Sequence, residues 1–266
     1  MTEESILLTE IRSHVGTLTF NRPQRKNALS LELLVAIHRT LQEWGGRDEV
    51  RVVVITGGST KAFSSGYDIA SIPTQMTPEL EEAMRSSNPL EFALNSVAEY
   101  PYPTIAMMNG YAYGAGLNLA MCCDIRIAVE DISVGMPPAK LGLVYHPEGI
   151  RQFLEVIGMA KTREIFLSAR TYLGEDARAM GLVDWLVPEA DLVSFTYSLA
   201  DEIAANAPLS LKGTKRILSM YREGMRLTQA RQQEAEKLMN EAFDSDDLKE
   251  GQMAFFEKRK PKFHGR

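Results

Sequence analysis

Cysteine is almost absent from this chain of 266 residues, which contains only Cys122 and Cys123, side by side. Two neighbouring thiols cannot cross-link distant segments, and the sequence has no C-x-x-C spacing of the kind that holds zinc. A disulfide framework is therefore excluded, and we expect no metal site. The reducing cytoplasm is the compartment that fits this cysteine usage best.

Long apolar runs are also missing. No run approaches the roughly 20 residues that a membrane span needs, and the most hydrophobic helix candidate is interrupted by Asn118 and Asp124. The first five residues contain two glutamates, which is not the pattern of a secretory or mitochondrial leader. We therefore expect a soluble cytoplasmic protein with no membrane partner.

Positive charge is in deficit, since 29 Lys and Arg stand against 35 Asp and Glu, for a net charge of −6. This balance gives no overall attraction to nucleic acid or anionic lipid, so neither is expected as a partner. An anionic ligand would have to meet a local basic patch. The composition, 45% apolar and 24% charged, is that of an ordinary globular protein.

Apolar periodicity predicts an α/β protein. Alternating or β-branched runs predict a hairpin over residues 6–20, a strand buried on both faces at 52–55, and short strands at 103–109, 124–129 and 133–136. Leu34, Ile37, Leu41 and Trp44 follow helical spacing after Ser30, a good N-cap, and glycines 45 and 46 end this helix.

The pattern of predicted strands and helices changes in the second half of the chain. Strands and helices alternate up to about residue 188, beyond which almost only helical periodicity remains. We place a boundary near residue 200, which divides the chain into a β/α core over 1–200 and a helical region over 201–266.

Two glycine-bearing turns follow predicted strands, one at residues 62–68 and the other at 109–116. Glycine lets backbone approach a ligand closely, and a helix that begins there presents free N–H groups. Such a turn can hold an anion or a polarised carbonyl. The alternative is that both are simply tight turns. Leu119 breaks the dinucleotide-binding fingerprint after the second turn.

Nearly the whole chain resembles the enoyl-CoA hydratase/isomerase (crotonase) superfamily in one register. The segments that carry this similarity are Arg22–Pro23, Lys26–Leu29, Lys61–Ile69, Asn109–Ala112, Gly114–Gly116, Ala120–Asp124, Lys140–Leu143, Gly181–Val183 and Glu250–Lys260.

The resemblance implies a crotonase-like spiral of β-β-α units followed by a C-terminal helical trimerisation region. It implies an acyl-CoA substrate, no cofactor beyond the CoA moiety, and a homo-trimer or a hexamer made of two trimers. By position, the backbone N–H groups of Tyr67 and Ala115 would form an oxyanion hole. Two such donors stabilise the negative charge that a thioester oxygen gains when an enolate forms.

The resemblance also implies contacts with CoA. Contacts carried over from the family place CoA against backbone near Lys26, Ala28, Ala62, Ser65, Asp68 and Ile69, with Phe255 and Lys258 arriving from a neighbouring subunit. Two of these contacts have an alternative explanation. Lys258 belongs to the basic segment 256–266, which could simply be a solvated end, and Asp68 could position the first turn rather than bind ligand.

The sequence departs from the family where hydratases carry two glutamates, because Asn118 and Pro138 occupy those positions. Neither residue exchanges a proton as a carboxylate does. We therefore do not predict an orthodox enoyl-CoA hydratase.

Closer similarity is to the methylmalonyl-CoA decarboxylase branch, carried by Met136–Pro138, Leu141–Tyr145 and the ending 244–265. Tyr145 matches a pocket tyrosine of that branch, whereas Tyr67 replaces a histidine and Asn118 an acidic residue. Loss of CO2 from a malonyl-type thioester forms the enolate without a base, which suits a site without the two carboxylates. The alternative is that both tyrosines are packing residues with a wet hydroxyl.

Two further hypotheses remain. His146 and Glu148 occupy a segment from which some isomerases of the superfamily draw a carboxylate, so an enoyl-CoA isomerase or atypical hydratase is possible. These residues could instead begin a helix, with Pro147 in its first turn. The third hypothesis is an acyl-CoA-binding protein without turnover.

Overall fold

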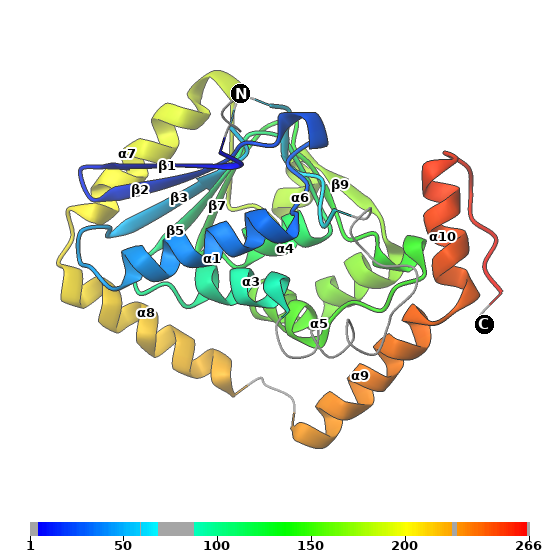
Figure 1. Ribbon diagram of the computed structural model, residues 1–266. Coiled ribbons are helices and arrows are strands. Elements are labelled where there is room, and N and C mark those ends of the chain that lie inside the picture. Colours follow the sequence, from blue (N-terminus) through cyan, green and yellow to red (C-terminus); the bar gives the residue numbers. More distant parts are fainter. Residues whose placement is uncertain (1–4, 59, 69–87, 225–227, 265–266) are drawn as a thin grey trace.

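A six-stranded sheet forms the core in the computed structural model, which describes residues 5–58, 60–68, 88–224 and 228–264 (Figure 1). Its order is β1-β2-β3-β5-β7-β10, with β1 antiparallel to β2 and each later pair parallel. The strands are β1 (Leu7–Arg12), β2 (Val15–Phe20), β3 (Val52–Thr56), β5 (Thr104–Met108), β7 (Ile125–Val129) and β10 (Trp185–Val187). The predicted hairpin and buried strand are confirmed.

Helices cover both faces of this sheet. Every residue of β3 is buried, as its continuous apolar run requires in a parallel sheet with two covered faces. Helix α1 (Leu31–Gly45) packs against α3 (Pro89–Ala98) on one side, and α7 (Leu192–Ala204) packs on β2, β3, β5 and β7 from the other (Figure 1). The predicted cap is confirmed, because Ser30 Oγ accepts the Leu33 N–H at 3.4 Å.

A second sheet carries the two glycine-bearing turns. Its strands are β4 (Ala62–Ser64), β6 (Tyr111–Tyr113), β8 (Ser133–Gly135) and β9 (Thr171–Leu173). The predicted turn over residues 109–116 is wrong in part, since β6 lies inside it. Pairing with β4 and β8, which lie far away in the sequence, decides this conformation, and local composition does not reveal it.

The remaining helices connect and surround these sheets. They are α4 (Ala115–Met121), α5 (Pro147–Ser168), α6 (Gly174–Ala179), α8 (Pro208–Glu223), α9 (Gln229–Phe243) and α10 (Asp246–Phe256), with short 3-10 turns η1 (Pro23–Arg25), η3 (Pro138–Leu141) and η4 (Glu189–Asp191). Within the described ranges, no helix is long and apolar enough to cross a membrane.

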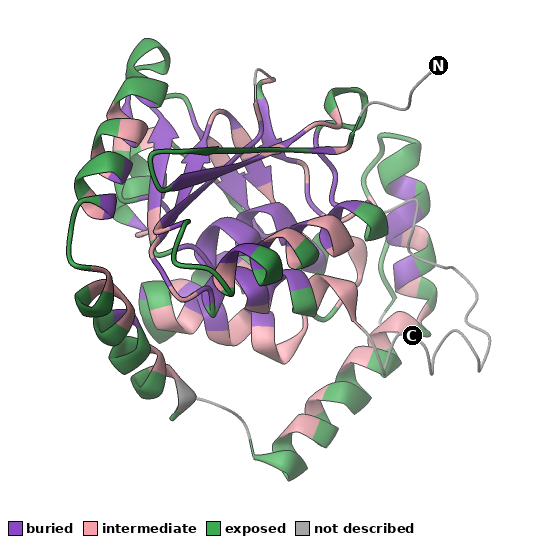
Figure 2. Ribbon diagram, turned by 60° about the vertical axis from the view of Figure 1, so that its left-hand side comes forward, coloured by how far each residue is buried: buried purple, intermediate pink, exposed green. Residues whose placement is uncertain are grey.

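The C-terminal helices leave the core and then return to it. Figure 2 shows buried residues concentrated in the inner strands of the large sheet, whereas α8 and α9 are mostly exposed or intermediate. Every residue of α4 is buried. The proposed boundary near residue 200 falls inside α7, which packs on the sheet. The role of residues 201–266 in trimerisation stays a prediction. Helix α10 packs against η3 of the same chain.

Candidate functional site

The two glycine-bearing turns lie against each other. Gly66, in the first turn, has a positive φ of 105°, and a Cβ there would lie 2.8 Å from the carbonyl oxygen of Tyr113 and 3.7 Å from the nitrogen of Ala115. A larger residue would push the second turn away. Glycine at position 66 therefore brings the backbone of Tyr67 and the start of α4 close together.

The amides of Tyr67 and Ala115 are both available. Leu29 donates to the Gly66 carbonyl (2.8 Å) and accepts from the Asp68 N–H (3.2 Å), so the Tyr67 N–H faces the other side of its chain. Ala115 is the first residue of α4, where N–H groups have no partner within the helix. Among the described residues, neither amide donates a hydrogen bond.

A cleft of about 820 Å³ opens beside the first turn. Four basic residues contribute to its wall, namely Arg25, Lys26, Lys140 and Arg259, as do five aromatic ones, Tyr67, Tyr111, Tyr113, Phe255 and Phe256. This is the local basic patch that an anionic partner of an acidic chain requires. The size and mixed lining suit a long ligand with both apolar and anionic parts.

Several predicted CoA-contact residues lie in this cleft. Lys26, Ala28, Ser65 and Asp68 line it. The Asp68 side chain is 10% exposed and forms ion pairs with Arg22 at 3.3 Å and Arg25 at 3.8 Å, which supports the alternative that it positions the turn.

Two others lie differently. Ala62 is buried in β4, and its carbonyl accepts from the Asn27 side-chain amide at 2.9 Å, so a CoA contact at Ala62 stays a prediction. Ile69 lies outside the described residues.

Phe255 lines the cleft of its own chain. The close approach of α10 to η3 explains this, since a Cβ on Gly251 would lie 2.6 Å from the Leu141 carbonyl oxygen. The expectation that Phe255 and Lys258 arrive from a neighbouring subunit stays a prediction. Lys258 follows α10, is exposed, and has a left-handed backbone with φ 54°.

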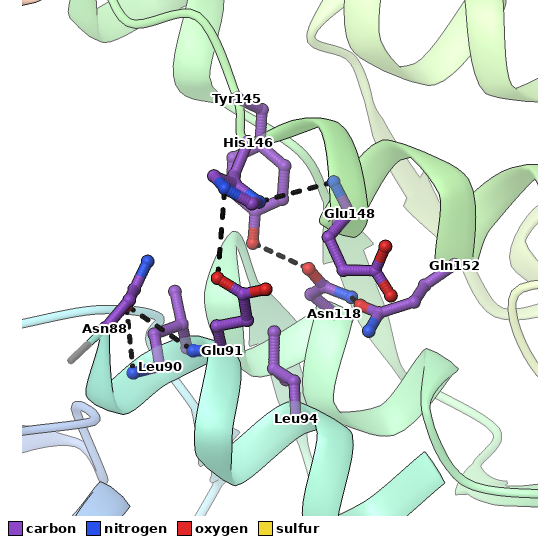
Figure 3. Close-up of a pocket in the computed structure, with 10 residues that line it drawn as sticks. Asn88, Leu90, Glu91, Leu94, Asn118, Tyr145, His146, Glu148 and Gln152 are labelled. Carbon is purple, nitrogen blue, oxygen red and sulfur yellow. Dashed lines mark hydrogen bonds and ion pairs between the residues drawn. The ribbon is translucent and has the colours of Figure 1, made fainter. Parts of the chain in front are cut away.

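A second, smaller pocket of about 40 Å³ collects the other candidate residues (Figure 3). Asn118 comes from α4, and Tyr145, His146 and Glu148 come from the start of α5 and the segment before it. The structure therefore places all four predicted side chains around one pocket.

A chain of hydrogen bonds runs along the wall of this pocket. The Tyr145 hydroxyl donates to Oδ1 of Asn118 at 2.9 Å, and Nδ2 of Asn118 donates to Oε1 of Gln152 at 2.6 Å. Asn118 is fully buried. Burial among these side chains raises the pKa of the Tyr145 phenol well above its ordinary value of 10.0. The Tyr145 hydroxyl therefore stays protonated at physiological pH, with its proton directed to Asn118.

Gly149 makes this arrangement possible. A Cβ at this position would collide with the Tyr145 ring and lie 2.7 Å from Oδ1 of Asn118. The absence of a side chain lets the α5 backbone pass close to both groups.

His146 and Glu148 take structural roles at the start of α5. His146 is the N-cap, and its Nδ1 accepts from the Glu148 N–H at 3.2 Å, with Pro147 as the first helical residue. This bond places the proton of a neutral His146 on Nε2, which lies 3.9 Å from Glu91. Oε2 of Glu148 accepts from Nε of Arg151 at 2.8 Å.

The two cysteines lie in the interior of the protein. Cys122 and Cys123 are buried, and burial raises the pKa of Cys123 to about 12. No group of three or more His, Cys, Asp or Glu in the described part of the chain is placed to hold a metal ion.

Helix α4 stands between the cleft and the pocket. Tyr113, just before this helix, lines the cleft, while Asn118 lines the pocket. Ala115 and Asn118 are three residues apart, about 4.5 Å along the helix axis. Ala115 itself lines neither the cleft nor the pocket.

These features define a crotonase-type enzyme that acts on acyl-CoA, and comparison with known proteins agrees. Residues 10–266 match the model of the enoyl-CoA hydratase/isomerase family. The chain belongs to this family, and its crotonase-like fold class is confirmed.

Relatives of more than one activity are similar to the chain. A putative enoyl-CoA hydratase/isomerase of Bacillus subtilis, YngF, is 31% identical over 98% of this chain and 99% of its own. The methylmalonyl-CoA decarboxylase of Escherichia coli is 28% identical over 94% of this chain and 95% of its own. A solved structure of methylmalonyl-CoA decarboxylase in complex with 2-nitronate-propionyl-CoA superimposes with a TM-score of 0.90 at 26% identity, covering 98% and 99% of the two chains.

Sequence reasoning missed several residues of the site. Gln152, Gly149 and Glu91 line the pocket, and Arg25 and Lys140 line the cleft. Gln152 follows Glu148 by one helical turn, which puts both on one face of α5, but nothing in the sequence indicates that α4 packs there.

Proposed function

We propose that the protein decarboxylates a malonyl-type acyl-CoA and stabilises the resulting thioester enolate with the N–H groups of Tyr67 and Ala115. The observation that supports this most is Asn118, an uncharged amide one helical turn from Ala115, whose Oδ1 accepts a hydrogen bond from the Tyr145 hydroxyl. The CoA moiety would lie in the basic cleft, and the acyl group would extend toward the pocket.

The reaction needs no base. The bond between the α-carbon and the carboxylate breaks, its electron pair enters the enolate, and CO2 leaves. One proton then adds to the α-carbon. Oxyanion stabilisation by backbone donors is the main requirement, and one such donor is typically worth about 3 kcal/mol. The Tyr145 hydroxyl, which burial keeps protonated, is the proposed source of the returning proton.

The residues at the two hydratase positions support this reaction over ordinary hydration. The side-chain amide of Asn118 is buried, with its oxygen and its nitrogen both in hydrogen bonds. Pro138 begins η3 and has no ionisable group. Hydration requires one group to activate water and another to deliver a proton, and neither residue does so.

A second candidate is an isomerase or atypical hydratase. The pair His146 and Glu91, 3.9 Å apart at the pocket, favours it because the two could pass a proton between carbons. Glu148 is less suited to this task, since Arg151 holds its carboxylate.

Incubation of the purified protein with methylmalonyl-CoA, malonyl-CoA and crotonyl-CoA separates the hypotheses. Release of CO2 from either of the first two supports decarboxylation. Loss or migration of the enoyl absorbance with crotonyl-CoA, without CO2 release, assigns the protein to the second candidate. Tight binding of all three with no product would identify an acyl-CoA-binding protein. The proposed compartment is the cytoplasm, and the proposed assembly is a trimer or hexamer, which sedimentation equilibrium would test.

A further inference from the structure

Ser64 lies between the two glycine-bearing turns. It is the last residue of β4 and is fully buried. Its Oγ donates to the Asn27 carbonyl at 2.8 Å and accepts from the Gly66 N–H at 3.2 Å. The hydroxyl is therefore fixed from two sides, and one of its partners is the backbone of the first turn.

The same side chain also packs on the second turn. Gly116 is the second residue of α4, and a Cβ there would lie 2.6 Å from Cβ of Ser64 and 2.7 Å from its Oγ. The backbone of α4 therefore rests directly on Ser64. Because Gly66 precedes Tyr67 and Gly116 follows Ala115, Ser64 contacts the chain neighbour of each proposed oxyanion donor.

The acceptor of the Ser64 hydroxyl is itself held in place. Asn27 is fully buried and has a left-handed backbone with φ 53°. Its Nδ2 donates to the carbonyls of Gly57 and Ala62, both at 2.9 Å, and its Oδ1 accepts from the Arg22 N–H at 3.1 Å. Ser64 is thus anchored to a well-fixed point of the fold.

We propose that Ser64 is a positioning residue that sets the separation of the Tyr67 and Ala115 amides. This inference rests on the proposed function, in which those amides hold the thioester oxygen. Two donors stabilise one oxyanion only if both lie within hydrogen-bond distance of the same point, and a displacement of about 0.5 Å is enough to lose that geometry. Ser64 acts on both sides, since its hydroxyl holds the first turn and its Cβ supports α4.

Binding of two matched CoA derivatives tests this role without turnover. Propionyl-CoA has the thioester carbonyl, and S-propyl-CoA has a methylene group in its place. Titration calorimetry gives the ratio of their dissociation constants. Isotope-edited infrared spectroscopy of carbonyl-labelled propionyl-CoA gives the carbonyl stretching frequency, which falls when hydrogen bonds polarise the carbonyl. We expect the unaltered protein to prefer propionyl-CoA and to lower this frequency.

Two substitutions change the hydroxyl. Ser64→Ala removes it but keeps the Cβ, so the first turn is released while the support of α4 remains. We expect a loss of roughly 3- to 10-fold of the preference for propionyl-CoA and a smaller fall in the carbonyl frequency. Ser64→Cys has a weaker hydrogen-bonding group and a larger atom against Gly116, so we expect the same two effects. This variant decides the test if Ser64→Ala does not fold.

Ser96→Ala is the matched control. Ser96 is also buried, and its Oγ donates to the Phe92 carbonyl at 2.7 Å and contacts Nδ1 of His38 at 2.6 Å. These partners belong to α3 and α1, so the control loses the same hydroxyl outside the two turns, and both measurements should be unchanged. Thermal unfolding of each variant establishes that it is folded.

The outcomes separate this role from the proposed reaction. Equal binding of the two derivatives and an unshifted carbonyl in the unaltered protein would overturn the oxyanion hole and the role of Ser64 together. Readouts that are unchanged in folded Ser64→Ala and Ser64→Cys would overturn the role of Ser64 alone. Weakening of both readouts in these variants, in a protein that releases no CO2 from malonyl-type substrates, would retain Ser64 and overturn the reaction.

Discussion

The Tyr145 hydroxyl donates a 2.9 Å hydrogen bond to Oδ1 of Asn118, joining the segment before α5 to the buried face of α4. This bond fixes the phenol in the wall of the pocket, against a residue that lies one helical turn from the proposed oxyanion donor at Ala115. Asn118 stands at one of the two positions where the family resemblance implies a hydratase glutamate, so the chemistry of the site depends on it.

Replacing Tyr145 with Phe should lower kcat with the true substrate by about 100-fold, because the variant lacks the proposed proton donor. The affinity for CoA, measured by calorimetry, should stay near normal, since Tyr145 does not line the cleft. Tyr172→Phe is a suitable control, because Tyr172 donates to Glu164 at 3.0 Å outside the pocket. Unchanged kinetics in Tyr145→Phe would identify it as a packing residue.

Replacing Glu148 with Gln should leave decarboxylation nearly unchanged. The variant loses the ion pair with Arg151, a partly exposed contact worth up to about 1 kcal/mol of stability. Steady-state kinetics and denaturant titration measure the two effects. A fall in kcat of about 100-fold or more would instead assign proton transfer to Glu148 and favour isomerisation.

Replacing Gly149 with Ala should destabilise the fold by about 1–3 kcal/mol and reduce kcat, because the new methyl group displaces Tyr145 or Asn118. Gly213→Ala is the matched control. A Cβ at Gly213 in α8 meets nothing within 4 Å, so that variant should be neutral or stabilised by up to about 1 kcal/mol. Equal stability of the two variants would contradict the close packing at Gly149.

Stability should fall at high pH. Burial raises the pKa of Tyr145 and of Tyr100 above the ordinary 10.0. Below pH 10 their contribution is fully present. Above it the unfolded chain loses phenolic protons that the folded chain keeps, so the free energy of unfolding decreases as pH rises.

Denaturant titrations across this pH range measure the slope. Tyr145→Phe should make the slope shallower by up to about 1.4 kcal/mol per pH unit. Tyrosinate absorbance that appears near pH 10 in proportion to all nine tyrosines, before any unfolding, would contradict the prediction.

Local sequence patterns predicted those parts of the fold that local forces decide. The Ser30 cap of α1 and the buried run of β3 both follow from short segments of sequence and are confirmed. Strand β6 was missed because its pairing partners are distant in the sequence. The resemblance to the family identified the correct superfamily and fold.

The site was predicted less completely. The four pocket residues Asn118, Tyr145, His146 and Glu148 do come together. Gln152 could not be found, because its place in the pocket arises from the packing of α5 on α4. The arrival of Phe255 from a neighbouring subunit stays a prediction, since a sequence does not specify which copy of a chain its last helix covers.

The strand order of the large sheet has a consequence for protein synthesis. β7 pairs with β5 on one side and with β10 on the other, and residue 187 ends β10. While the ribosome is still making residues 130–184, the open edge of β7 has no neighbour. Unpaired edges invite aggregation, so the emerging chain should depend on chaperones most strongly during that interval. Ribosome-bound chains halted before residue 185 should accordingly be more sensitive to protease than chains halted after α7 has emerged.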